Sequence, residues 1–207
     1  MTSSRAALTQ VRWVVIDCET SGLDAKRDRL LSLGAVSVRG RRIALAEAYG
    51  AVLRQAQPSA RENIAIHGIG GEAQRAGRPA AEALRELAAF AADAVPAAFH
   101  APFDAEVLRR ALKAAGAPPL PRRWLDLAQL APALYPAPAR SLRALEDWLA
   151  HFGIAPRGRH DALGDALATA ELLLVMLEEA DRQGVKTLGE LLAVGPARRW
   201  LGNYSAT

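Results

Sequence analysis

A short apolar strand that runs straight into two carboxylates is the feature that most constrains this chain. The strand reads RWVVID over Arg12–Asp17, a β-branched run typical of a buried strand, and Cys18 and Glu19 follow it. Because side chains alternate along a strand, Asp17 and Glu19 lie on one side and Cys18 on the other. Two carboxylates leaving a buried strand together are costly unless they are neutralised, and a hard divalent cation does this well. The alternative is a solvated strand end, since an Asp-x-Glu triplet arises about once by chance in such a chain.

The length and composition are those of an ordinary globular chain. It has 207 residues, of which 51% are hydrophobic and 23% are charged. These values exclude a disordered chain, a collagen-like fibre and an acidic tail. The single cysteine, Cys18, excludes a disulfide framework and a zinc site made mainly of thiolates. The net charge of +4 is compatible with a polyanionic partner, but it also fits a general bias towards arginine.

The sequence shows neither a membrane span nor an export signal. The longest apolar runs, such as Leu172–Leu177, fall far short of the roughly 18 residues that a membrane-spanning helix needs. The segment MTSSRAALTQ lacks the apolar core of a secretory signal. Together with the unpaired Cys18, these features predict a cytoplasmic location and no membrane partner.

Apolar periodicity and turn residues predict an α/β fold. The expected strands lie at residues 12–17, 30–38, 42–53 and 95–99, the first three as an antiparallel meander. The expected helices lie at residues 80–94, 102–115, 161–183 and from the cap Ser141 to Phe152. Strands first and then strands mixed with helices predict a mixed sheet with helices packed on it. The expected organisation is a flexible N-terminus at residues 1–10, one domain at 11–183 and a helical extension at 184–207.

Two further segments place acids at the starts of helices. Asp104, in FHAPFD, falls in the first turn of a helix just after a strand, where favourable interaction with the helix dipole is the alternative explanation. In RHDALGDA, His160 and Asp165 are five residues apart and would differ by roughly 140° on a regular helix. We therefore expect His160 in the preceding loop, where it can lean over a metal held by Asp165. Asp161 is the rival carboxylate, and capping the helix is the role we expect for it.

These segments together resemble the DnaQ-like (DEDD) superfamily of 3′–5′ exonucleases, in the branch whose last motif carries histidine. The resemblance covers about residues 12–178 and rests on IDCETSGLD, FHAPFD and RHDALGDA, with ENIAIHGI between the first two. It implies a ribonuclease-H-like fold with a mixed five-stranded sheet flanked by helices. It also implies a metal-dependent enzyme that hydrolyses single-stranded DNA or RNA from the 3′ end to nucleoside monophosphates.

The resemblance also implies a role for individual residues. The carboxylates would hold two divalent cations, Mg²⁺ or Mn²⁺, and they are Asp17, Glu19, Asp104 and Asp165. His160 would act as the general base, for which an unperturbed imidazole pKa near 6.5 is suitable. The terminal nucleotide would be contacted by Thr20, Gly22, Leu23 and His67. A buried loop leucine and a structural histidine are the alternative explanations for the last two.

Two departures from the family pattern and three functional hypotheses stay open on sequence alone. Ala101 stands where the family usually has asparagine, and Ser32 where it often has glutamate. Neither position is a metal ligand, although Ala101 could weaken support for Asp104 or alter substrate choice. The alternatives to the exonuclease are a phosphodiesterase for very short RNA and a nucleic-acid-binding scaffold without turnover. The choice between DNA and RNA, a polymerase partner, a repair or RNA-processing role and the oligomeric state are not derivable from the sequence.

Overall fold

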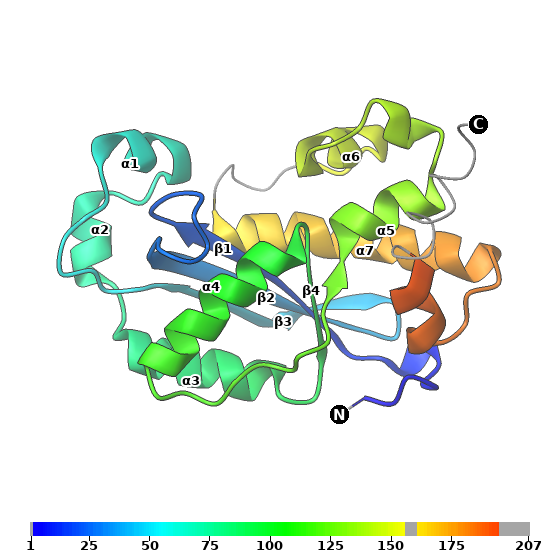
Figure 1. Cartoon of the computed structure of the whole chain (residues 1–207), viewed down its shortest axis with the longest axis horizontal. Helices are drawn as coiled ribbons and strands as arrows, with labels where there is room; N and C mark the ends of the chain where they lie inside the picture. Colours follow the sequence, from blue (N-terminus) through cyan, green and yellow to red (C-terminus); the bar gives the residue numbers. More distant parts are fainter. Residues whose placement is uncertain (1, 156–160, 195–207) are drawn as a thin grey trace.

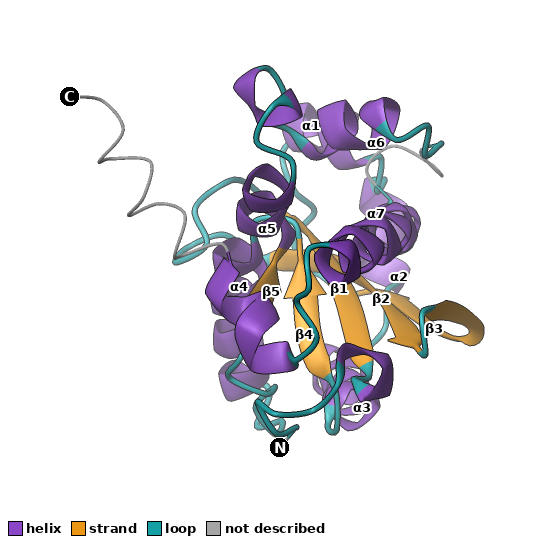
Figure 2. Cartoon of the chain, turned by 90° about the vertical axis from the view of Figure 1, so that its right-hand side faces the viewer, coloured by secondary structure: helices purple, strands orange, loops and turns teal. Residues whose placement is uncertain are grey.

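The computed structural model of the chain describes residues 2–155 and 161–194. Within these residues one sheet of five strands has the order β3-β2-β1-β4-β5 (Figure 2). The strands are β1 (Trp13–Thr20), β2 (Leu30–Arg39), β3 (Arg42–Val52), β4 (Val95–Ala98) and β5 (Leu125–Asp126). The first three pair antiparallel, whereas β4 runs parallel to β1 and β5 parallel to β4. The predicted meander and the mixed five-stranded sheet flanked by helices are confirmed.

Helices cover both faces of this sheet. They are α1 (Arg61–His67), α2 (Gly71–Ala76), α3 (Ala80–Ala91), α4 (Ala101–Ala114), α5 (Leu127–Leu134), α6 (Leu145–His151) and α7 (Ala162–Arg182), with short 3₁₀ turns at Leu8–Gln10 and Pro138–Arg140. In Figure 1, α4 crosses in front of the strands and the long helix α7 runs along them. None of the helices in the described residues is both long and apolar enough to cross a membrane.

The alternation of side chains along β1 divides the interior into two cores. Trp13 and Val15 point to one face and pack with buried residues of α5, α6 and α7. Val14 and Ile16 point to the other face and pack with buried residues of α3 and α4. Burial of each such large apolar side chain contributes roughly 1.5–3 kcal/mol. The central strand is therefore held on both faces, which fixes the position of the carboxylates at its end.

Some local expectations differ from the structure. The segment between Pro58 and Gly71, where the sequence analysis places no helix, holds α1 and is followed by α2. Ser141 does not cap a helix through Phe152. It ends a 3₁₀ turn instead, and α6 begins only at Leu145. The reason is local: the Asp147 carboxylate accepts the backbone N–H groups of Arg143 and Ala144 at 2.8 and 2.9 Å, which places the helix start there.

The two terminal parts of the described chain lie together. Leu8 is buried, and its N–H donates to the carbonyl of Lys186 at 3.0 Å. The N–H groups of Leu188 and Gly189 donate to the carbonyls of residues 6 and 4. Residues 188–194 are helical, and Leu188 and Leu191 are buried in the core beneath α7. The division into residues 1–10, 11–183 and 184–207 stays a prediction.

Candidate active site

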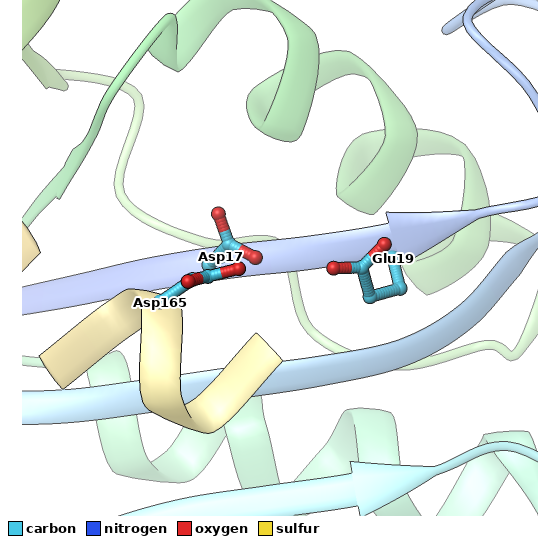
Figure 3. A group of neighbouring side chains, drawn as sticks. All are labelled: Asp17, Glu19 and Asp165. Atoms are coloured by element: carbon cyan, nitrogen blue, oxygen red, sulfur yellow. The ribbon is translucent and has the colours of Figure 1, made fainter. Parts of the chain in front are cut away.

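Three of the predicted ligands converge at the end of β1. Asp17 and Glu19 lie on the face of β1 that α7 covers, and Asp165 reaches them from the first turn of α7 (Figure 3). One carboxylate oxygen from each residue lies within 4.8 Å of the others. All three side chains are half-buried. Oxygen atoms gathered in this way are the ligands that hard divalent cations prefer.

A glycine in β2 allows α7 to come this close. Gly34 stands opposite Asp17 in the antiparallel ladder. A Cβ atom at Gly34 would overlap the backbone carbonyl of Ala162, the first residue of α7. The helix therefore rests directly on the strand backbone, and the first turn of α7 carries Asp165 towards Asp17. Gly34 is a site-forming residue that the sequence analysis did not identify, because its role depends on a contact between distant segments.

The fourth predicted ligand, Asp104, approaches from the other side of the sheet. It lies in the first turn of α4 and is only 5% exposed. It is not among the three acids that converge within 4.8 Å. Its neighbour is Cys18, which faces α3 and α4 as alternation requires and hydrogen-bonds the Asp104 carboxylate. Asp104 nevertheless lies close enough to Asp17 for the two charges to interact strongly.

Burial and mutual repulsion raise the pKa of the carboxyl groups. Burial is the largest cause for Asp17, whose pKa is also raised by the charges of Asp104, Glu19 and Asp165. For Glu19, burial followed by the charges of Asp165 and Asp161 raises the pKa to about 7. Burial raises the pKa of Asp104 to about 7, although the hydrogen bond from Cys18 opposes the shift. Asp17 is thus the central acid, since both helices place a carboxylate beside it.

At the start of α7, the prediction for Asp161 is confirmed and the prediction for His160 stays untested. Asp161 is the N-cap of α7, and its carboxylate accepts the Gly164 N–H at 3.2 Å, as expected for a capping role. The charge of Asp161 still reaches Glu19, so its position beside the site has an electrostatic effect. His160, the predicted general base, lies outside the described residues, and its role stays a prediction.

The β1–β2 loop exposes an apolar side chain a few residues after the acids of β1. Leu23 is 94% exposed, so the alternative of a buried loop leucine is wrong. The Thr20 hydroxyl donates to the Gly22 carbonyl at 2.6 Å and closes the turn at the end of β1. A Cβ at Gly22 would meet the Asp28 carboxylate at 2.6 Å, so a larger residue there would have to displace that carboxylate. The roles of Thr20, Gly22 and Leu23 in substrate binding stay predictions.

His67 is held inside the protein by its neighbours. It ends α1 and is only 3% exposed. Its Nδ1 accepts the Ile69 N–H at 3.0 Å, and its Nε2 lies 3.1 Å from the Ser59 hydroxyl. The Gln74 side chain completes this network through Ser59 and the Ile69 carbonyl. These contacts give His67 a structural role, and contact with substrate stays a prediction.

Asp126, an acid that the sequence analysis did not identify, supports the start of α4. Asp126 ends β5 and caps α5, and its Oδ1 accepts N–H groups of His100, Ala101 and Ala128 at 3.1 to 3.3 Å. His100 has a φ of 64°, a left-handed conformation that is uncommon for residues other than glycine. Asp126 therefore anchors the sharp turn that aims α4, and with it Asp104, at the end of β1. An acid before the apolar run LAQL is the signal for such a cap.

An open cleft adjoins the acids. It has a volume of about 540 Å³ and lies between β2, β3, the end of α1 and the start of α7. Its lining includes Ser32, His67 and Asp161. Ser32 stands opposite Glu19 in the ladder, so the cleft lies next to the part of the sheet that carries Glu19, although none of the four candidate acids lines it. The fold and site thus define a protein with a carboxylate centre at the end of a central strand and a cleft nearby.

Comparisons with known proteins identify the family. A model of the RNase T exonuclease family matches residues 14–173. A DNA polymerase III subunit epsilon-like protein of Rhodobacter capsulatus is 37% identical over 189 residues, which cover 89% of this chain and 26% of that protein. The PolC-type DNA polymerase III of Thermotoga maritima is 31% identical over 179 residues, which cover 86% of this chain and 13% of that protein. The chain therefore spans only a small part of these relatives.

Solved structures share the fold. Exonuclease I of E. coli in complex with a dT13 oligonucleotide has a TM-score of 0.73 at 19% identity, covering 84% of this chain and 42% of that one. Exonuclease I from Methylocaldum szegediense has a TM-score of 0.69 at 22% identity, covering 81% and 40%. The fold is ribonuclease-H-like. The chain belongs to the exonuclease family, among the DnaQ-like 3′–5′ exonucleases, as the resemblance predicted. This family uses divalent metal ions.

Proposed function

We propose that this chain hydrolyses single-stranded DNA from its 3′ end and releases nucleoside monophosphates. The observation that carries the proposal is the convergence of Asp17, Glu19 and Asp165 within 4.8 Å, with Asp104 buried beside Asp17. In a chain of the exonuclease family, this arrangement of acids supports metal-dependent cleavage of a phosphodiester.

The residues present fit a pair of divalent cations. Three of the four carboxylates, those of Asp17, Glu19 and Asp104, have pKa values raised by burial and by neighbouring charges, so the ionised group is unfavourable until positive charge neutralises it. Asp17, Glu19, Asp104 and Asp165 would hold the ions, and Mg²⁺ or Mn²⁺ suits an all-oxygen set of ligands. When bound, such ions supply positive charge that stabilises the negative charge developing during phosphoryl transfer.

The chain's own side chains would hold the substrate and move the proton. His160 would take a proton from water as the water oxygen bonds to the terminal phosphorus. The bond from phosphorus to the 3′ oxygen of the preceding nucleotide then breaks, and this oxygen takes up a proton from solvent, leaving a 3′ hydroxyl and a nucleoside 5′-monophosphate. The exposed Leu23 would pack on the terminal base, because its apolar side chain is free for contact. Thr20 and Gly22 would shape the turn that receives the terminal nucleotide.

The comparisons support DNA as the substrate. The relatives are named as DNA polymerase III proteins, and the E. coli structure holds an oligonucleotide of dT. The proposal takes a single strand as the substrate, because another solved structure of E. coli exonuclease I is a complex with ssDNA. A polymerase partner is a further proposal that rests on the names of the same relatives.

A gel assay tests the proposal. The purified chain is incubated with 5′-labelled single-stranded DNA or RNA, in Mg²⁺, Mn²⁺ or EDTA. We expect a ladder that shortens from the 3′ end of DNA, that needs the divalent ion, and that disappears in Asp17→Asn. His160→Ala is expected to lower the rate by about a hundredfold, in line with the loss of a general base.

A matched variant on the same helix as a proposed ligand serves as control. Asp165→Asn should abolish the ladder, whereas Asp181→Asn, at the exposed far end of α7, should leave it intact. Equal cutting by Asp165→Asn and the unaltered chain contradicts the site. Faster cutting as the oligonucleotide shortens to a few nucleotides of RNA instead favours the short-RNA phosphodiesterase.

A further inference from the structure

Arg110 of α4 holds the β1–β2 loop by donating side-chain hydrogen bonds to backbone carbonyls of that loop. The Arg110 guanidinium donates to the carbonyl of Ala25 at 2.7 Å and to the carbonyl of Asp28 at 3.1 Å. A third bond, at 3.4 Å, reaches the carbonyl of Arg27. The planar fork of a guanidinium suits several acceptors at once, whereas a lysine ammonium offers only a point charge. Arg110 therefore holds three carbonyls of one turn.

The loop that Arg110 holds is itself tightly bonded. The Asp28 carboxylate accepts the Ser21 hydroxyl at 2.9 Å and the Asp24 N–H at 2.8 Å. The Asn63 side chain of α1 donates to the Ser21 carbonyl from the opposite side. A loop with this internal network moves as one piece, so a grip on residues 25–28 also places Leu23.

Arg110 and Asp104 belong to the same helix. Asp104 lies in the first turn of α4 beside Asp17, and Arg110 lies further along, where the helix meets the loop. The distance between the acids and the exposed Leu23 is thus set by one rigid element.

We propose that Arg110 is a positioning residue, which holds the β1–β2 loop so that Leu23 meets the 3′-terminal nucleotide at the correct distance from the acids. This proposal takes its substrate, the 3′-terminal nucleotide, from the proposed function. The hydrogen bonds between Arg110 and the loop do not depend on that function. Loss of Arg110 frees the loop and weakens capture of the terminal nucleotide. The acids and the fold of the sheet stay in place, so the defect falls on KM rather than on kcat.

Steady-state kinetics on single-stranded DNA give the first test. We expect Arg110→Ala to raise KM about tenfold with kcat within about twofold of the unaltered chain. Arg110→Lys should restore little, since the three donors of an ammonium share one nitrogen on a flexible stem and lack the planar spread with which the guanidinium reaches the three carbonyls. In a Leu23→Ala background, removing Arg110 should change KM very little, because the side chain through which it acts is already absent.

Limited proteolysis gives a readout that needs no activity. Lys26 and Arg27 are exposed residues of the gripped loop, and trypsin cuts after either. Mass spectrometry should show cutting at these two positions about tenfold faster in Arg110→Ala, because local opening controls access. Arg109→Ala is the matched control. Arg109 is the preceding residue of α4, is 61% exposed and pairs with Glu106, so neither KM nor cutting should change.

The outcomes test the role of Arg110 in holding the loop separately from the proposed nuclease function. Unchanged cutting in Arg110→Ala overturns the proposal, as does an equal rise of KM with and without Leu23. A fall in kcat and melting temperature without faster loop cutting assigns Arg110 a general structural role and also overturns it. If the unaltered chain cleaves no nucleic acid, the proposed function fails, and loop proteolysis alone then decides whether Arg110 holds the loop.

Discussion

Two helices bring an aspartate to the end of β1 from opposite faces of the sheet, and they do so by different means. Asp104 and Asp165 are each the fourth residue of their helix. Asp165 joins Asp17 and Glu19 in the group within 4.8 Å and is half-buried, whereas Asp104 lies outside that group and is 5% exposed. The same local position thus gives a half-buried acid in the first case and an enclosed acid in the second.

The difference arises from what supports each helix. The start of α7 rests on bare strand backbone at Gly34, which determines how closely Asp165 approaches. The start of α4 follows a left-handed His100 whose N–H is bound by Asp126. One acid is therefore placed by close packing and the other by a hydrogen-bonded turn. Substitutions of Gly34 and of Asp126 should therefore affect the placement of Asp165 and Asp104 separately.

The largest effect is expected from the acids themselves. Asp104→Asn and Asp165→Asn should each lower kcat/KM by about a thousandfold or more, because each removes charge that holds the cations. The two should differ in stability without divalent ions. Asp104→Asn should raise the melting temperature more at pH 8, since it removes the more deeply buried charge. Thermal unfolding in EDTA measures this, and equal stabilities would contradict the contrast.

Substitution of Gly34 tests the close packing of α7. Gly34→Ala places a Cβ against the Ala162 backbone, so we expect a loss of about 2 kcal/mol in the free energy of unfolding. Activity should fall about a hundredfold, because Asp165 moves away from Asp17.

The matched control is Gly50→Ala. Gly50 pairs with Gly34 in the ladder, but its Cβ would meet only the Leu163 side chain at 3.4 Å, an ordinary contact. Activity and urea unfolding should both stay near those of the unaltered chain. A comparable loss of activity and stability in both variants would show that the close approach of α7 to Gly34 does not determine the position of Asp165.

Removal of Asp126 tests the hydrogen-bonded turn. Asp126→Ala leaves three N–H groups without their acceptor, and we expect a loss of about 1 kcal/mol in stability and about tenfold in activity. Asp147→Ala removes a comparable N-terminal acceptor from α6, away from the acids. It should lower stability without lowering activity. Equal activity losses would mean that Asp126 acts only through overall stability.

The smallest effect is a pH dependence of stability. The pKa of Glu19 rises from 4.5 to about 7 and that of Asp104 from 3.8 to about 7 on folding. A carboxyl with a raised pKa favours the fold while protonated, so its contribution is complete below about pH 4 and is lost as pH rises through about 7. In EDTA the melting temperature should therefore fall by about 4 °C between about pH 5 and pH 8.

Divalent ions provide the internal control for that measurement. Mg²⁺ should remove most of this fall, because cations neutralise the ionised acids, while all other groups titrate alike with and without the ion. Glu19→Gln should narrow the gap between the EDTA and Mg²⁺ curves. A gap that is the same at both pH values would contradict the raised pKa values.

The sequence by itself determined the candidate acids and the order of most elements. Asp17 and Glu19 follow an apolar run, and Asp104 and Asp165 follow helix-start signals, so each is visible within a few residues. The predicted start of the helix after Ser141 was wrong, because the Asp147 carboxylate accepts the N–H groups of Arg143 and Ala144 and the helix begins after them. The short α1 and α2 were missed because neither has a side-chain cap and each is too short for a clear apolar period.

Only the tertiary structure decided how far apart these acids lie and what holds them. Gly34, Asp126 and Arg110 act on segments that are 128, 26 and about 83 residues away along the chain. Local pattern cannot show such contacts, because they depend on which backbone atoms the folded sheet and helices bring together. For the same reason, the local sequence does not distinguish Asp104 from Asp165. Their burial, and hence their proposed contribution to the centre, comes from the face of the sheet on which each helix packs.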